Sequence, residues 1–131
     1  MKAPAAVTLK LLAGPLAVCR LEAGAPVPAW AVGALTSVTR TPEELSVVCA
    51  EQAVPEGIRA ERGFRCLSVV GPISFATSGL LASLSALLAD AGVSIFVLST
   101  FDTDLLLLRQ ADLAQAVAVL RGGGHAVTGL P

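Results

Sequence analysis

The chain has 131 residues, which is enough for one compact unit or for two very small ones packed as one. Hydrophobic residues make up 54% and charged residues 15%, so the composition excludes disorder and favours an oligomer interface that covers excess apolar surface. The net charge is −1 and the sequence has no Lys/Arg run, so neither nucleic acid nor a membrane surface is an expected partner.

The cysteine and histidine content argues against a metal centre. Cys19, Cys49 and Cys66 are odd in number and form no C-x-x-C pair, which predicts buried thiols in a reducing compartment, the cytoplasm. His125 is the single histidine, so a metal site would have to mix scattered ligands. We therefore expect no metal and no cofactor.

The first half of the chain predicts strands and little helix. Its start, "MKAPAAVTLKLLAGPLAVC", is similar to a lipoprotein signal, but Lys10 interrupts the apolar stretch and the bulky Val18 precedes the cysteine. The signal remains the alternative to two strands joined by a turn at "AGP". Strands are expected at 7–12, 16–21, 35–40 and 45–50, and at most single helical turns at 26–34 and 55–61.

The second half predicts six elements in the order strand, helix, strand, strand, helix, strand. Leucines recur at helical spacing between Ser74, a candidate N-cap, and Ala91, while Asp112 and Gln115 approach a capping box. Strands are expected at 64–70, 93–99, 104–109 and 125–130, and helices at 74–91 and 112–122. This order predicts an α+β fold, the ferredoxin-like βαββαβ unit.

A short internal match links the two halves. When Leu45 is aligned with Leu105, "SVTRTPEELSVV" runs beside "VLSTFDTDLLLL", with Glu44 on Asp104. Both segments read as strand, hydroxyl-rich turn, acid and strand. The match favours a reduced copy of the same unit in the first half, and ordinary hairpin chemistry is the alternative.

The segment "LSTFDTDLLLL", preceded by "SVVGPISFATSGLLASLSALLADAGVSIFV", resembles the small bacterial tandem ACT-domain proteins related to the CASTOR arginine sensors. In that family a Gly-Pro loop leads into the first helix, and an S-T-x-x-T-D-like turn follows a "VSIF"-like strand. "TPEELSVV" resembles the matching stretch of the first, degenerate ACT copy. The resemblance implies a degenerate, strand-rich ACT-like half at 1–62 and an ACT domain at 63–131.

The resemblance also implies a function: a regulatory module, a homodimer, that binds an amino acid at the interface between ACT units. The residues carried over are the loop and helix start Gly71, Pro72, Ile73 and Ser74, the interface-strand residues Ser94 and Ile95, and the floor residues Thr100, Phe101 and Asp104, with Asp102 beside Asp104. Ser74 is neutral where the sensors have a second acidic contact, which argues against a strongly cationic ligand such as arginine. The downstream protein partner is not identified.

Elementary chemistry fits this assignment. Backbone N–H groups at the start of the Ser74 helix can donate to a carboxylate, and Gly71 permits close approach. Asp104, beside Asp102, can accept from an ammonium group. The alternative is an ordinary hairpin loop in which Asp and Thr bond the turn backbone, with Asp102 the better turn former.

Other functions known for this fold need residues that the sequence does not supply in the right places. An acylphosphatase-type enzyme needs an Arg in the first loop and an Asn, and the chain contains no Asn. A serine or cysteine nucleophile would depend on His125, which we expect to be solvated at the last strand's entry. An RNA-binding sheet needs exposed aromatic residues, and the chain has no Tyr. We expect no enzyme and no catalytic residue; a structural, dimerising ACT-like domain without a ligand remains the alternative.

Overall fold

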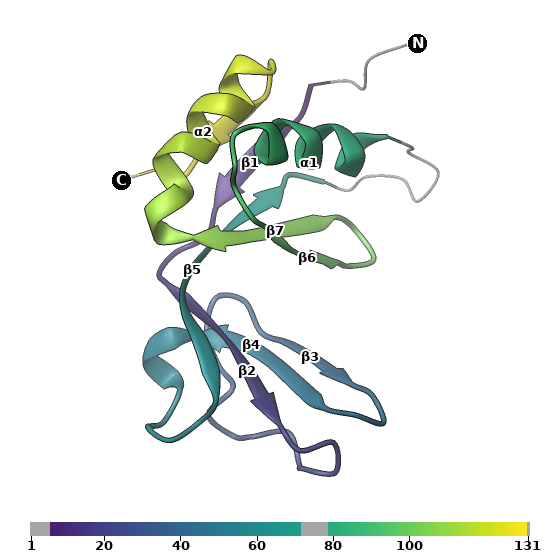
Figure 1. Cartoon of the computed structure of the whole chain (residues 1–131), viewed down its shortest axis with the longest axis vertical. Helices are drawn as coiled ribbons and strands as arrows, with labels where there is room; N and C mark the ends of the chain where they lie inside the picture. Colours follow the sequence, from purple (N-terminus) through teal and green to yellow (C-terminus); the bar gives the residue numbers. More distant parts are fainter. Residues whose placement is uncertain (1–5, 72–78, 131) are drawn as a thin grey trace. The chain divides into compact units, whose positions relative to one another are not determined.

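The computed structural model describes residues 6–71 and 79–130. Residue contacts divide the chain into two units. Unit 1 comprises residues 1–12 and 65–131, and unit 2 comprises residues 13–64. The first half of strand β5 (Ala60–Val69) belongs to unit 2, and its second half belongs to unit 1 (Figure 1). The sequence interpretation placed all of 1–62 in one half, whereas the first twelve residues group with the C-terminal unit.

Unit 1 has the ferredoxin-like α+β fold predicted from the sequence. After β5 come α1 (Leu80–Asp90), β6 (Phe96–Ser99), β7 (Asp104–Arg109), the 3-10 turn η2 (Gln110–Asp112), α2 (Leu113–Gly122) and β8 (Ala126–Thr128). Both helices pack on one face of the sheet (Figure 1). The element order confirms the predicted βαββαβ unit. None of the helices in the described residues is both long and apolar enough to cross a membrane.

One further strand, β1 (Thr8–Leu11), lies inside the sheet of unit 1, which runs β8-β1-β5-β7-β6. Leu9 pairs with Val69 of β5 in antiparallel register and with Val127 of β8 in parallel register. The predicted turn at "AGP" is therefore not a hairpin turn. Because β5 is ten residues long, its second half pairs with β1 while its first half pairs with β2 (Leu16–Leu21).

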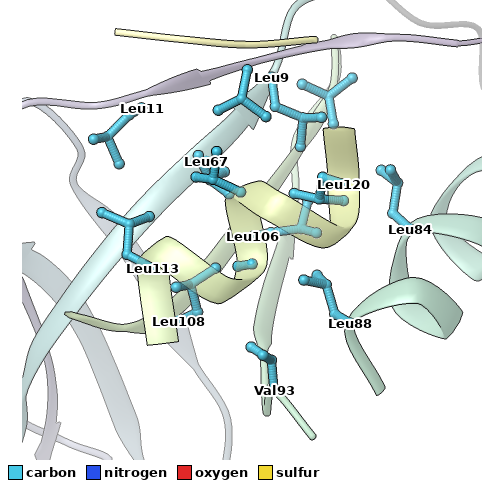
Figure 2. Close-up of a cluster of buried hydrophobic side chains, with 14 of the residues drawn as sticks. Leu9, Leu11, Leu67, Leu84, Leu88, Val93, Leu106, Leu108, Leu113 and Leu120 are labelled. Atoms are coloured by element: carbon cyan, nitrogen blue, oxygen red, sulfur yellow. The ribbon is translucent and has the colours of Figure 1, made fainter. Parts of the chain in front are cut away.

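The core of unit 1 is aliphatic and lies between the sheet and the two helices (Figure 2). Helix α1 buries Leu80, Leu84 and Leu88, which recur every fourth residue and so share one face. Strand β7 buries all of its leucines, as predicted for a strand covered on both faces. The buried members of this core are Leu9, Leu11, Leu67, Val69, Leu80, Leu84, Leu88, Val93, Leu106, Leu108, Leu113, Ala116, Val117, Leu120 and Val127.

The helix starts differ from the sequence prediction. The predicted capping box at Asp112 is wrong: its side chain makes no capping hydrogen bond, and Gln115 Nε2 instead donates to Ala91 O at 3.0 Å. The turn η2 gives Asp112 a backbone with φ −95° and ψ −3°, not the extended conformation of a capping residue. Ser74 lies outside the described residues; the described helix begins after Gly79, whose φ is 82°.

Unit 2 is a small sheet with the strand order β3-β4-β2-β5. Besides β2 and β5 it contains β3 (Ser37–Arg40), β4 (Leu45–Ala50) and the 3-10 turn η1 (Glu51–Ala53). These strands confirm the predictions at 16–21, 35–40 and 45–50, although β3 is shorter. The buried core consists of Ala17, Cys19, Leu45, Val47, Cys49 and Val54, with Trp30 packed against it.

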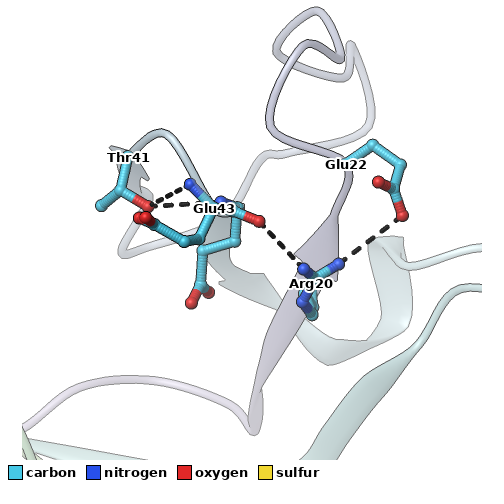
Figure 3. Close-up of polar contacts among 5 residues, drawn as sticks. Arg20, Glu22, Thr41 and Glu43 are labelled. Carbon is cyan, nitrogen blue, oxygen red and sulfur yellow. Dashed lines mark hydrogen bonds and ion pairs between the residues drawn. The ribbon is translucent and has the colours of Figure 1, made fainter.

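Arginines hold the loops of unit 2 in place. The Arg20 guanidinium donates to Glu43 O at 3.0 Å and lies 3.7 Å from the Glu22 carboxylate (Figure 3). Arg40 donates to the carbonyl groups of Ala23 and Ala25. Each of these contacts joins a strand to a loop. They therefore hold the loops in place where the small apolar core offers few packing contacts.

The buried polar side chains correct one prediction and confirm another. Cys19, Cys49 and Cys66 are free and buried, as predicted, and burial raises the pKa of Cys66 to about 12 and that of Cys19 to about 11. His125 was expected to be solvated but is only 7% exposed. Its Nδ1 accepts a hydrogen bond from Val7 N at 3.1 Å, because the chain entering β1 lies beside β8.

Candidate functional site

The loop between β6 and β7 is closed by its threonines. Thr100 N donates to Thr103 O at 2.8 Å, and Thr103 N donates to Thr100 Oγ1 at 3.2 Å. Side-chain oxygens that accept from the turn backbone are the usual means of stabilising such loops. We call this loop, residues 99–104, together with Gly71 the corner of unit 1.

The two aspartates of the corner take no part in closing the loop. Asp102 is exposed, and Asp104 is half-buried at the first position of β7. Ser99 Oγ donates to Asp104 Oδ1 at 2.6 Å, a charge-assisted hydrogen bond between paired strand ends. Within the described residues, neither carboxylate accepts a hydrogen bond from the loop backbone. Asp102 is thus not the turn former expected from the sequence.

Thr103 fastens the loop to the neighbouring strand. Its Oγ1 donates to Val69 O at 2.5 Å, in the last residue of β5. Val70 N in turn donates to Thr8 O at 2.8 Å, and the exposed Gly71 follows. The two segments predicted to form one site, the hairpin loop and the chain leading into the first helix, therefore meet at Thr103.

The remaining predicted residues differ in exposure, and three of them lie outside the described residues. Ser94 is exposed and Ile95 is half-buried against the core, and both precede β6, which begins at Phe96 and not at residue 93. Phe101 is 82% exposed. Pro72, Ile73 and Ser74 lie outside the described residues.

The sequence interpretation did not select Ser99 and Thr103, although the structure gives both a specific role. Ser99 bonds Asp104 and Thr103 bonds β5. The signal was present, because both belong to the S-T-x-x-T-D pattern that carried the resemblance. Spacing alone does not distinguish a hydroxyl that closes the loop from one that reaches another strand.

The hairpin of unit 2 has the same loop geometry. Thr41 N donates to Glu44 O at 2.9 Å, and Glu44 N donates to Thr41 Oγ1 at 3.2 Å. Thr41 thus corresponds to Thr100. The strand ends agree: Arg40 pairs with Leu45 where Ser99 pairs with Asp104.

This equivalence corrects the predicted alignment by one residue. Glu44 corresponds to Thr103 and not to Asp104, and the position of Asp104 is held by Leu45 in unit 2. The same loop therefore forms with a leucine where unit 1 has an acid. Asp104 is not required by the turn.

Two further features bear on ligand binding: the possible metal-ligating side chains and two hollows outside the corner. Within residues 6–71 and 79–130, no three His, Cys, Asp or Glu side chains come together as metal ligands would. One hollow, of about 400 Å³, is lined by residues of η2 and α2 with Leu130. Another, of about 320 Å³, is lined mainly by small residues at 13–16 and 33–34 in unit 2.

Comparison with known proteins relates both parts of the chain to described families. Residues 59–122 match the family model of the ACT domain, and residues 14–57 match the model of an N-terminal domain. No curated protein matches the sequence.

Solved structures extend the likeness to nearly the whole chain. The crystal structure of protein Atu0741 from Agobacterium tumefaciens is 38% identical, with a TM-score of 0.91 over 97% of this chain and 96% of that one. A Vibrio cholerae protein of unknown function, titled a possible transport protein, is 21% identical, with a TM-score of 0.71 over 89% of each chain. The regulatory subunit of aspartate kinase from Thermus thermophilus is 11% identical, with a TM-score of 0.59 over 87% of this chain and 93% of that one.

Proposed function

The chain belongs to the same family as the Agobacterium protein and carries an ACT domain, and we propose that it is a regulatory module that binds a free amino acid at the corner of unit 1. The fold it shares with a regulatory subunit of aspartate kinase supports a regulatory role. The ligand would bias the packing of ACT units against one another, and a further protein would respond to that packing.

The observation that carries the proposal is that the carboxylate of Asp104 is not needed by the loop. The threonine hydroxyls close the turn in both hairpins, and unit 2 does so with Leu45 in place of the acid. A half-buried carboxylate is costly to keep where it has no structural task. Among the described residues Asp104 accepts one hydrogen bond, from Ser99, which leaves acceptor sites on both oxygens for an ammonium group.

The other groups of the corner suit the rest of a zwitterion. Gly71 has no side chain to block a ligand's main chain. The exposed Phe101 ring offers apolar surface for a side chain or for a neighbouring subunit. Ile73 would supply its backbone N–H, and Ser74 its N–H and hydroxyl, as donors for the ligand's carboxylate; Pro72 has no N–H and would only shape the loop. With one acid at the floor and neutral Ser74 in the loop, the proposed ligand is a small neutral amino acid.

We place the second wall of the site on a partner subunit of a homodimer. Strand β6 is an edge strand of unit 1, and its Phe96, Val97 and Leu98 are half-buried. An apolar edge strand pairs readily with a second copy. Ser94 and Ile95, which precede that edge, would then face the corner of the other subunit. The free, buried thiols support a cytoplasmic location.

A thermal-shift screen of the twenty amino acids tests the proposal. A ligand present at a hundred times its Kd should stabilise the protein by about 2.7 kcal/mol. Asp104→Asn should abolish the shift because the neutral amide no longer attracts the ammonium group. Asp90→Asn, which alters an exposed acid at the end of α1, should leave the thermal shift unchanged.

If none of the twenty amino acids shifts the melting temperature at millimolar concentrations, the result would favour a second candidate function, a dimerising domain without a ligand. The exposed Phe101 also argues for that function.

A further inference from the structure

The hollow beside α2 has the size and lining of a ligand pocket. Its volume is about 400 Å³, within the range of small-molecule sites. The walls are Ala111, Leu113, Ala114, Val117 and Leu130, with Gln110 as the polar member. All belong to unit 1, and none belongs to the corner.

Gln110 has a free donor that its surroundings orient. Arg65 donates to Gln110 Oε1 at 3.0 Å, so the amide nitrogen points the other way. In the part of the chain that the structure describes, Gln110 Nε2 has no hydrogen-bond acceptor. The only polar side chain of the lining is thus held in one orientation with its N–H groups available.

The charge behind Gln110 is positive. Arg65 donates to Gln110 and to Leu12 O at 3.3 Å, both neutral acceptors, and its buried Nε has no partner among the described residues. None of the described carboxylates forms an ion pair with this guanidinium. An uncompensated cation bonded to the amide oxygen polarises the amide and makes its N–H groups stronger donors to an anion.

We propose that this hollow binds an aliphatic monocarboxylate, with its chain on Leu113, Val117 and Leu130 and its carboxylate on Gln110 Nε2. The site is independent of the amino-acid site at the corner. The apolar walls select an aliphatic chain, and the oriented amide backed by Arg65 selects the anionic head.

Octanoate is the probe, with octan-1-ol as its neutral analogue. Titration of the full chain, followed by the NMR signals of the Gln110 side-chain amide, should give saturable shifts with octanoate. Octan-1-ol should bind at least tenfold more weakly. Equal binding of the two compounds, or shifts that never saturate, would overturn the proposal.

Three variants locate the site, and a fourth separates it from the corner. Ala114→Phe fills the hollow from an exposed wall position, and Gln110→Glu keeps an oxygen for Arg65 while replacing the donor by a carboxylate; each should weaken octanoate binding more than tenfold. Ala86→Phe places the same ring at an exposed position of the other helix, α1, which does not line the hollow, and should bind like the parent. Asp104→Asn should also bind octanoate unchanged, which separates this test from that of the corner. If Ala114→Phe instead changes the sedimentation coefficient, a second copy occupies the hollow and the proposal is wrong.

Discussion

Buried thiols make the stability of this protein sensitive to alkaline pH. The pKa of Cys66 is about 12 and that of Cys19 about 11, because burial penalises the thiolate; the ordinary value is 9.0. When folding raises the pKa of a group, that group contributes its full stabilisation of the folded state at pH values below its pKa in the unfolded chain. That contribution is lost as pH rises through the folded pKa. The chain has no Tyr, and the groups whose pKa burial raises in this range are the cysteines.

We therefore expect the free energy of unfolding to fall as pH rises from about 9 to 12, by about 1.4 kcal/mol per pH unit for each ionised thiol of the unfolded chain. Urea titrations across this range measure it. Cys66→Val should have a shallower slope than the parent, since it removes the thiol with the highest pKa. Equal slopes would contradict the assignment.

His125 is expected to be a structural anchor of the chain entering β1. Its Nδ1 accepts from Val7 N at 3.1 Å, so His125→Ala leaves a half-buried N–H without a partner. The cost should be about 1–3 kcal/mol in the free energy of unfolding. Faster hydrogen exchange at the Val7 amide should accompany it. His125→Asn, which retains an acceptor, should recover part of the loss; equal exchange in both variants would argue against this role.

At the scale of the element, the end of β8 approaches β1 so closely that only glycine fits. Gly129 has φ 81°, and a Cβ there would lie 2.8 Å from Leu11 O. Gly124 has φ 95° but open space around it. Gly124→Ala should cost about 1 kcal/mol for the left-handed backbone alone. Gly129→Ala should cost distinctly more, because the contact is with rigid backbone, and chemical denaturation of the two variants compares them directly. An equal loss of stability in the two variants would show that the end of β8 moves to make room for the Cβ.

Elements with a strong local pattern were predictable from the sequence. The leucine spacing of α1 and the apolar run of β7 gave their positions, because side chains of one face must recur at the period of the element. The capping of Asp112 was not predictable, because the preceding turn η2 alters its backbone. The place of β1 depends on pairing with strands far along the chain, which no local pattern encodes.

The candidate site was predictable only in part. The motif located the loop that contains Asp104, but the roles of Ser99 and Thr103 follow from which strand each hydroxyl reaches. The sequence alignment of the two hairpins was shifted by one residue because it matched the acidic residues Glu44 and Asp104. The loop is defined by the threonine that closes it.

At the scale of the whole molecule, the sequence-based boundary at residue 62 omits a strand of unit 1. Leu9 is fully buried and Leu11 is 4% exposed in its core, and β8 pairs with β1. A chain of residues 63–131 alone should therefore unfold without a cooperative transition, whereas the full chain should show one. Adding a peptide of residues 1–13 should restore the transition, measured by circular dichroism. A cooperative transition of the fragment by itself would contradict this.

The pairing of β1 with β8 also has a consequence for biosynthesis. The ribosome produces β1 among the first segments of this sequence, yet its parallel neighbour emerges more than a hundred residues later. Residues 13–64 can assemble their own sheet while translation continues, since their strands are close together in the chain. Until β5 and β8 have been made, Leu9 and Leu11 must stay exposed or be shielded by a chaperone, so the nascent β1 segment is where aggregation during synthesis would begin.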